Sequence, residues 1–127
     1  MIKQIVLVAL GGGVGSAFRY LASVWIAKQF PCTFPLGTFI VNITGCFIIG
    51  LLIGLSVRFS IFDNELKYFL IAGFCGGYTT FSTFSVENMK LLESGNYWTL
   101  TLYVTGSVLL GLIAVWGGYL LSKTITQ

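Results

Sequence analysis

Long apolar stretches separated by short polar ones dominate the chain. Residues 4–18 carry no charged side chain, and after Arg19 the uncharged run continues to residue 27. Three further uncharged runs cover residues 30–57, 68–86 and 94–122. A helix needs about 20 apolar residues to cross the hydrocarbon core of a bilayer, so each run is long enough, the third only just. The pattern predicts an all-α integral membrane protein with four transmembrane helices, at about residues 4–27, 36–57, 67–92 and 97–122.

The predicted connections are short, so we expect residues 1–127 to form a single four-helix transmembrane domain. The apolar start after Lys3 also has the look of a signal peptide. No small-residue cleavage pattern follows it, however, and Arg19 interrupts the run. A first transmembrane helix is the better interpretation.

The composition offers little material for catalysis. Charged side chains make up 9% of the chain, far fewer than in a soluble domain. Histidine is absent and only four carboxylates are present, which leaves little for general acid–base chemistry. The three cysteines have no metal-site spacing and are expected to pack as small apolar side chains. We therefore expect no enzyme, no organic cofactor and no nucleic-acid partner, and a lipid bilayer as the surroundings.

Glycines lie four residues apart within the predicted spans. The pattern occurs in residues 11–15, 50–54 and 73–77. Small residues on one helix face let neighbouring helices approach closely in a membrane. The first cluster superficially looks like a phosphate-binding loop, but the preceding strand and the ordered glycine spacing are missing. Close helix packing is the predicted role.

The third span contains a polar stretch. Residues 76–85 read Gly-Gly-Tyr-Thr-Thr-Phe-Ser-Thr-Phe-Ser, which places five serine and threonine hydroxyls at membrane depth. Because unpaired polar groups cost several kcal/mol each in hydrocarbon, such a stretch survives only where it faces protein or a watery cavity. We predict that the third helix breaks here and that this is the working part of the molecule.

Polar groups recur at helical spacing in the neighbouring spans as well. One face of the second helix carries Thr38, Asn42 and Gly45. One face of the fourth helix carries Tyr103, Ser107 and Gly111. In the third helix two aromatic rings stand among hydroxyls that can line a common surface: Phe81 and Phe84 with Thr80, Ser82, Thr83 and Ser85. Interhelical hydrogen bonding alone would explain any one of these faces. Three together favour a permeation path.

Arg19 is the charge embedded in the first span. A cation inside a span is a functional-site hypothesis by default, although arginine can also extend to the interface. Two interpretations stay open: a structural role, and attraction of anions toward a vestibule.

Three motifs, in order along the chain, resemble those of the Fluc (CrcB) fluoride channels. They are Gly11-Gly12-x-x-Gly15 with Arg19-Tyr20, Gly37-Thr38-x-x-Val41-Asn42-x-x-Gly45, and Gly73-Phe74-x-Gly76-Gly77-x-Thr79-Thr80-Phe81-Ser82-Thr83-Phe84-Ser85. The resemblance covers essentially the whole chain, and the third motif is highly specific. It implies a fluoride-selective channel of the bacterial inner membrane that exports fluoride passively and lowers its toxic cytoplasmic concentration. It also implies an antiparallel, dual-topology homodimer with two pores and a central structural sodium ion.

The resemblance further implies roles for single residues. The positions that match the pore are Asn42, Phe81, Phe84, Tyr103 and Ser107. Gly76 and Thr79 match the positions whose backbone carbonyls hold sodium. One departure is visible, because some relatives continue the polar face of the fourth helix with a serine where this chain has Gly111.

The physical chemistry of fluoride agrees with these roles. A small, strongly hydrated anion needs amide and hydroxyl donors that replace water without a full charge that would trap it, and phenylalanine edges are weakly positive. The short loops also give only a weak orientation signal, with four lysines or arginines on one side and two on the other.

Two other functions remain as alternatives. A small four-helix drug/proton antiporter can also be dimeric with dual topology, but it needs a carboxylate within a helix, typically the first, where this chain has Arg19. Glu87 is the only acid near a span. A non-conducting packing subunit would not require the hydroxyl-rich break.

Overall fold

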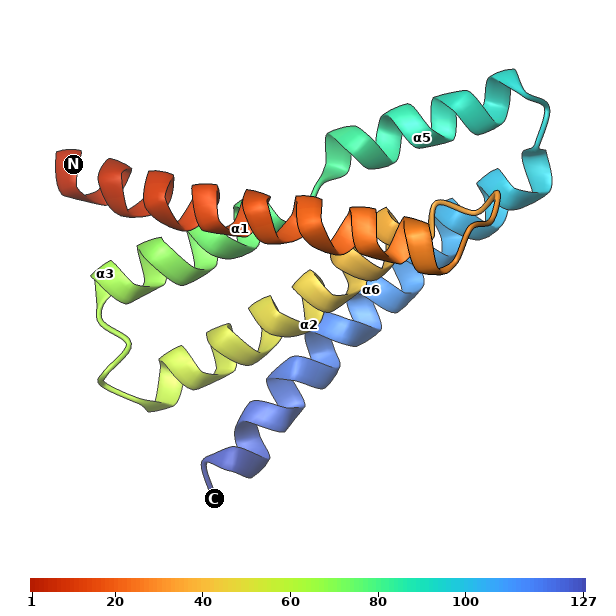
Figure 1. The fold of residues 1–127 in the computed structure, drawn as a ribbon. Helices are drawn as coiled ribbons and strands as arrows, with labels where there is room; N and C mark the ends of the chain where they lie inside the picture. Colours follow the sequence, from red (N-terminus) through yellow and green to blue (C-terminus); the bar gives the residue numbers. More distant parts are fainter.

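The computed structural model describes all 127 residues, Met1–Gln127, and contains helices and no strands (Figure 1). Its elements are α1 (Ile2–Gln29), α2 (Leu36–Arg58), α3 (Asn64–Lys67), the π-helical segment η1 (Tyr68–Cys75), α4 (Gly76–Tyr78), α5 (Phe81–Glu93) and α6 (Tyr97–Ile125). Four helical segments, Ile2–Gln29, Leu36–Arg58, Asn64–Glu93 and Tyr97–Ile125, are long and apolar enough to cross a membrane. The predicted all-α membrane fold is confirmed, and the helices extend up to three residues beyond their predicted ends.

Local signals set the ends of the third span. At its start, the Asp63 carboxylate accepts a hydrogen bond from the backbone N–H of Leu66 at 2.9 Å, which pairs a donor that the first helical turn leaves free. At its end, Gly95 adopts a φ of 75°, which suits glycine. The N–H groups of Gly95 and Asn96 then bond back to the carbonyls of Leu92 and Leu91, a Schellman motif that ends α5 sharply and turns the chain into α6.

Glycines bring α1 against the third span. A methyl group added at Gly11 or Gly15 would collide with the backbone carbonyl of Phe69 or Phe74, so the helix backbones touch directly. The contact runs along η1 and α4, which lie beside α1 in Figure 1. The packing role predicted for the first and third glycine clusters is confirmed.

The second helix pair, α2 and α6, is built in the same way. A methyl group at Gly50 would meet the Val115 carbonyl, and one at Gly118 would meet the Phe47 carbonyl. The two helices lie side by side along most of their length (Figure 1). Only 16 of the 127 residues are buried, so most apolar side chains point outward, as expected of helices surrounded by lipid.

The last piece of the third span, α5, stands apart from the main packing. It contacts α6 and, more weakly, α2, and the ribbon shows it separated from the α1–η1 pair (Figure 1). Phe81 at its start is 79% exposed. The break in the third span thus separates a well-packed half from a half with a largely uncovered surface.

Candidate functional site

The third helix breaks at two threonines. Between α4 and α5, Thr79 has φ −85° and ψ 157°, and Thr80 has φ −149° and ψ 117°, both extended rather than helical. The predicted break is therefore present. It falls near the middle of the segment Asn64–Glu93, where a membrane offers no water to the freed backbone groups.

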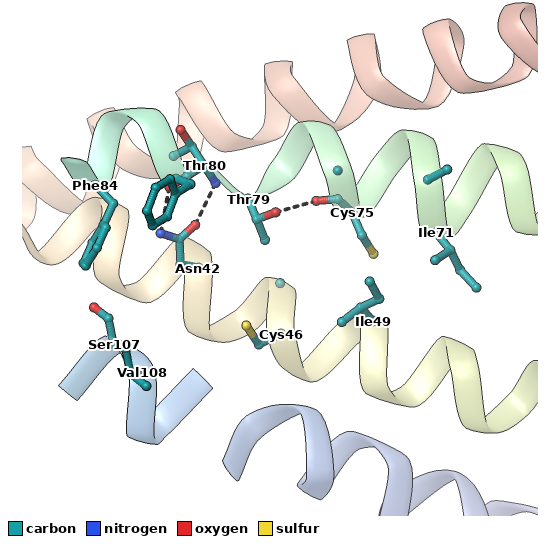
Figure 2. Close-up of a pocket in the computed structure, with 14 residues that line it drawn as sticks. Asn42, Cys46, Ile49, Ile71, Cys75, Thr79, Thr80, Phe84, Ser107 and Val108 are labelled. Atoms are coloured by element: carbon teal, nitrogen blue, oxygen red, sulfur yellow. Dashed lines mark hydrogen bonds between the residues drawn. The ribbon is translucent and has the colours of Figure 1, made fainter. Parts of the chain in front are cut away.

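The side chain of Asn42 supplies the hydrogen bonds that the break needs. Its Oδ1 accepts from the Thr80 N–H at 2.8 Å, and its Nδ2 donates to the Thr80 carbonyl at 3.1 Å (Figure 2). One amide from α2 thus pairs both backbone polar groups of a buried, extended residue. The sequence reasoning treated Asn42 as a pore donor and missed this bracing role. One N–H of the amide remains for another partner.

Hydroxyl groups continue the network into α5. Thr80 Oγ1 accepts from the Thr83 N–H at 3.2 Å, which makes Thr80 the N-cap of the helix. The same oxygen donates to Thr83 Oγ1 at 3.1 Å and lies 3.3 Å from Ser82 Oγ. These hydroxyls therefore serve one another and the helix end.

The same contacts release two backbone carbonyls. In a continuous helix the Thr80 N–H would bond to the Gly76 carbonyl, and the Thr83 N–H to the Thr79 carbonyl. Here those N–H groups bond instead to Asn42 Oδ1 and Thr80 Oγ1. Gly76 and Thr79 thus lose their usual helical donors, and both residues line an open cavity.

That cavity has a volume of about 610 Å³ and lies between α2, the third span and α6 (Figure 2). It gathers most of the predicted site residues, namely Asn42, Gly76, Thr79, Thr80, Phe81, Phe84 and Ser107. Two cysteines, Cys46 and Cys75, also line it. Four predicted site residues are not among its lining residues: Arg19, Ser82, Thr83 and Tyr103.

Two buried hydroxyls lie on α6, that of Ser107 at the cavity lining and that of Tyr103 beyond it. The Tyr103 hydroxyl and Ser107 Oγ, one helical turn apart on α6, are buried without a hydrogen-bond partner. Phe84 lies between Phe81 and Tyr103, with ring centroid distances of 5.8 Å to Phe81 and 4.9 Å to Tyr103. The rings of Phe81, Phe84 and Tyr103 therefore form a series of contacts that leads from the break to the buried hydroxyls of α6.

Glu87 lies next to these buried groups, and the sequence reasoning did not assign it a role. It lies beside Thr38 and Tyr103, and its Oε1 is buried without a hydrogen-bond partner. Its spacing of three residues from Phe84 on α5 was the available signal, since such residues share a helix face.

Arg19 stands apart from these groups. It is half-buried on α1, and the one salt bridge of the structure joins Lys3 to Glu65 instead. Both interpretations of this cation, the structural one and the vestibule one, stay predictions.

The fold and the cavity define a class: a small polytopic membrane protein whose third span breaks around polar side chains at mid-membrane depth. Residues 6–119 match the family model described as "CrcB-like protein, Camphor Resistance (CrcB)". A relative from Azobacteroides pseudotrichonymphae is 48% identical over 123 residues, which cover 97% of this chain and 98% of the relative. A relative from Flavobacterium psychrophilum is 48% identical over 124 residues, covering 98% and 100%, and one from Leptospira interrogans is 41% identical over 121 residues, covering 95% of each.

These three relatives all bear the name "Fluoride-specific ion channel FluC". The chain belongs to the CrcB family, so the membership predicted from the motifs is confirmed.

Proposed function

We propose that the chain forms a fluoride-selective channel that exports fluoride passively across the bacterial inner membrane and so lowers its toxic concentration in the cytoplasm. The observation that carries this proposal is the pair of buried, unpartnered hydroxyls on α6, Tyr103 and Ser107, beside the Phe81–Phe84 ring pair. Buried hydroxyls without partners are costly unless a ligand meets them. The names of the relatives support fluoride as that ligand.

The chemistry of the surface suits a small anion. Hydroxyls and the spare N–H of Asn42 can replace water around fluoride, and none of them carries a full positive charge that would hold the ion too tightly. Ring edges are weakly positive, so Phe81 and Phe84 can face an anion where hydroxyls are sparse. Several weak contacts in sequence allow the ion to leave as well as to enter.

A second copy of the chain is part of the proposal. Ser82 and Thr83 are exposed near the middle of the third span, and the Phe81 ring beside them is 79% exposed. Lipid would cover the ring well but the hydroxyls poorly, whereas a second copy would cover both. The family resemblance and the weak charge bias of the loops favour an antiparallel, dual-topology homodimer.

Sodium is the proposed structural ion of that dimer. The carbonyls of Gly76 and Thr79 have lost their usual helical donors, both residues line the open cavity, and sodium takes such neutral oxygen ligands. On a two-fold axis a second copy would add the same two carbonyls, giving four oxygens. When bound, the ion would fix the two broken helices to each other.

The test is flux from purified protein in liposomes. We expect rapid fluoride efflux, little chloride efflux, and no uptake of a cationic drug under a proton gradient. Ser107→Ala should slow fluoride efflux, whereas Thr105→Ala, an exposed hydroxyl on the same helix, should not. Drug exchange without fluoride efflux would instead support the antiporter, which the names of the relatives do not favour.

A further inference from the structure

The loop between α1 and α2 carries an aromatic ring into the molecule. Phe34 of this loop is half-buried, whereas Phe30 at its start is 57% exposed. The Phe34 ring lies 5.3 Å from that of Phe39 at an angle of 81°, and 5.3 Å from that of Tyr103 at 69°. Both are edge-to-face pairs, a favoured arrangement of aromatic rings. The loop accordingly lies beside the first turns of α6 (Figure 1).

The backbone around Phe34 is held by a tight turn. Pro35 has φ −75° and ψ 69°, and the Leu36 N–H donates to the Phe34 carbonyl at 2.7 Å, which together define an inverse γ-turn. The thiol of Cys32 donates to the same carbonyl at 3.2 Å. Because proline fixes φ, the turn is preorganised and presents the Phe34 ring to α2 and α6 in one orientation.

The ring of Tyr103 is oriented mainly by other aromatic rings. Its side chain is fully buried, and its hydroxyl lies beside Thr38 and Glu87 without forming a hydrogen bond to either. Its ring is instead held by three phenylalanines, with centroid distances of 4.9 Å to Phe84, 5.3 Å to Phe34 and 6.4 Å to Phe39. Phe84 belongs to the proposed pore and Phe39 is only tilted against the ring, so Phe34 is the edge contact that comes from outside the pore.

We propose that Phe34 is a positioning residue of the permeation path, which it serves by fixing the ring of Tyr103 so that the hydroxyl faces the passing fluoride ion. The inference rests on the proposed function, since the contact of Tyr103 with fluoride belongs to it. Without the Phe34 ring, Tyr103 can turn away from the path. The anion then loses a donor, and fluoride efflux slows.

The experiment compares Phe34→Ala with Phe30→Ala, which removes the same side chain from an exposed site in the same loop. Both proteins are purified as folded oligomers and assayed for fluoride and chloride efflux from liposomes. We expect Phe34→Ala to slow fluoride efflux about tenfold, the scale of one or two aromatic contacts, and Phe30→Ala to leave it unchanged. Phe34→Trp, which keeps an aromatic edge, should retain most of the flux, and Phe34→Leu should not.

A double-mutant cycle shows whether Phe34 acts through the tyrosine hydroxyl. If it does, Phe34→Ala costs less in a Tyr103→Phe background, where no hydroxyl is left to misplace. An equal loss in both backgrounds would overturn the proposal, as would equal flux in Phe34→Ala and Phe30→Ala. If Tyr103→Phe alone stops conduction, the cycle cannot be read, and the fluoride efflux of Phe34→Trp is compared with that of Phe34→Leu instead. Equal efflux in these two variants counts against the proposal.

The failure of the proposed function has a different signature. In that case the unmodified protein transports no fluoride at all. If only the assignment of Phe34 is wrong, the unmodified protein still transports fluoride normally, and Ser107→Ala still slows the efflux.

Discussion

At the scale of single residues, the role of Asn42 is to supply what the backbone of the broken helix lacks. Its amide pairs both polar groups of Thr80, and the Thr80 hydroxyl then caps α5. The residue type and its polar helix face could be predicted from the sequence. Its partner could not, because the two residues are 38 positions apart and no local periodicity relates them.

Replacing Asn42 tests this role. Asn42→Ala leaves the buried N–H and carbonyl of Thr80 unpaired, at a cost of about 1–3 kcal/mol for each group. We expect fluoride efflux to fall more than about tenfold, since the break and the donor are lost together. Asn42→Asp should also fail, because a carboxylate cannot donate to the Thr80 carbonyl. Asn64→Ala, at an exposed position on α3, serves as the control, and gel filtration checks that the variants keep the oligomeric state of the unmodified protein.

Phe81 offers a second test at this scale. Its ring is 79% exposed within one chain, so few intramolecular contacts depend on it. Phe81→Ile keeps the apolar volume but removes the aromatic edge, and we expect a large loss of fluoride efflux with little change in thermal stability in detergent. Normal efflux from the folded variant would show that the ring edge is not part of the pore.

At the scale of elements, the molecule consists of two helix pairs that pack through glycines, α1 with the first half of the third span and α2 with α6, and of α5, which contacts only α6 and α2 closely. The spans and the glycine faces were predictable because both follow from periodic patterns in the sequence. The π-helical winding of η1 and the separation of α5 were not, since both depend on contacts with other helices rather than on the composition of the segment itself.

Adjacent glycines on α6 give a matched pair for the packing. A methyl group at Gly118 would collide with the Phe47 carbonyl on α2, whereas one at Gly117 meets no atom within 4 Å. Gly118→Ala should therefore destabilise the protein by about 1–3 kcal/mol, as overpacking does. Gly117→Ala should be neutral or stabilise it by up to about 1 kcal/mol, because alanine restricts the unfolded chain. Thermal unfolding in detergent measures both, and equal midpoints would contradict the close contact of α2 and α6.

At the scale of the whole molecule, the exposed hydroxyls of Ser82 and Thr83 near the break support the proposed second copy. Family membership could be predicted from the motifs alone, and the comparisons confirm it. The antiparallel assembly stays a prediction, which rests on the resemblance and on the weak charge bias of the loops.

Topology reporters test the antiparallel arrangement. With four cationic side chains on one side and two on the other, the loops give a weak instruction, so we expect copies in both orientations. Reporters fused to the C-terminus should show activity on both sides of the membrane. Detection of a single orientation in every molecule would contradict the antiparallel dimer.

Removal of sodium tests the proposed ion. If the carbonyls of Gly76 and Thr79 hold sodium between two copies, complete replacement of sodium by a large organic cation should impair fluoride efflux even though sodium does not permeate. Restoring sodium should restore the flux. Undiminished efflux in the organic cation would rule out a structural role for sodium.

The hydrogen bonds from Asn42 have a consequence for how the chain is made. The break is not encoded within the third span alone, because α2 supplies the amide that pairs Thr80. Synthesis proceeds from the N-terminus, so α2 has left the ribosome before residues 64–93 do. Had the order been reversed, the Thr80 N–H would first find the carbonyl one turn behind it, and the 30-residue segment would enter the bilayer as an unbroken rod of about 45 Å, well beyond the hydrocarbon thickness. The order of the helices along the chain thus lets the third span meet its hydrogen-bond partner as it inserts.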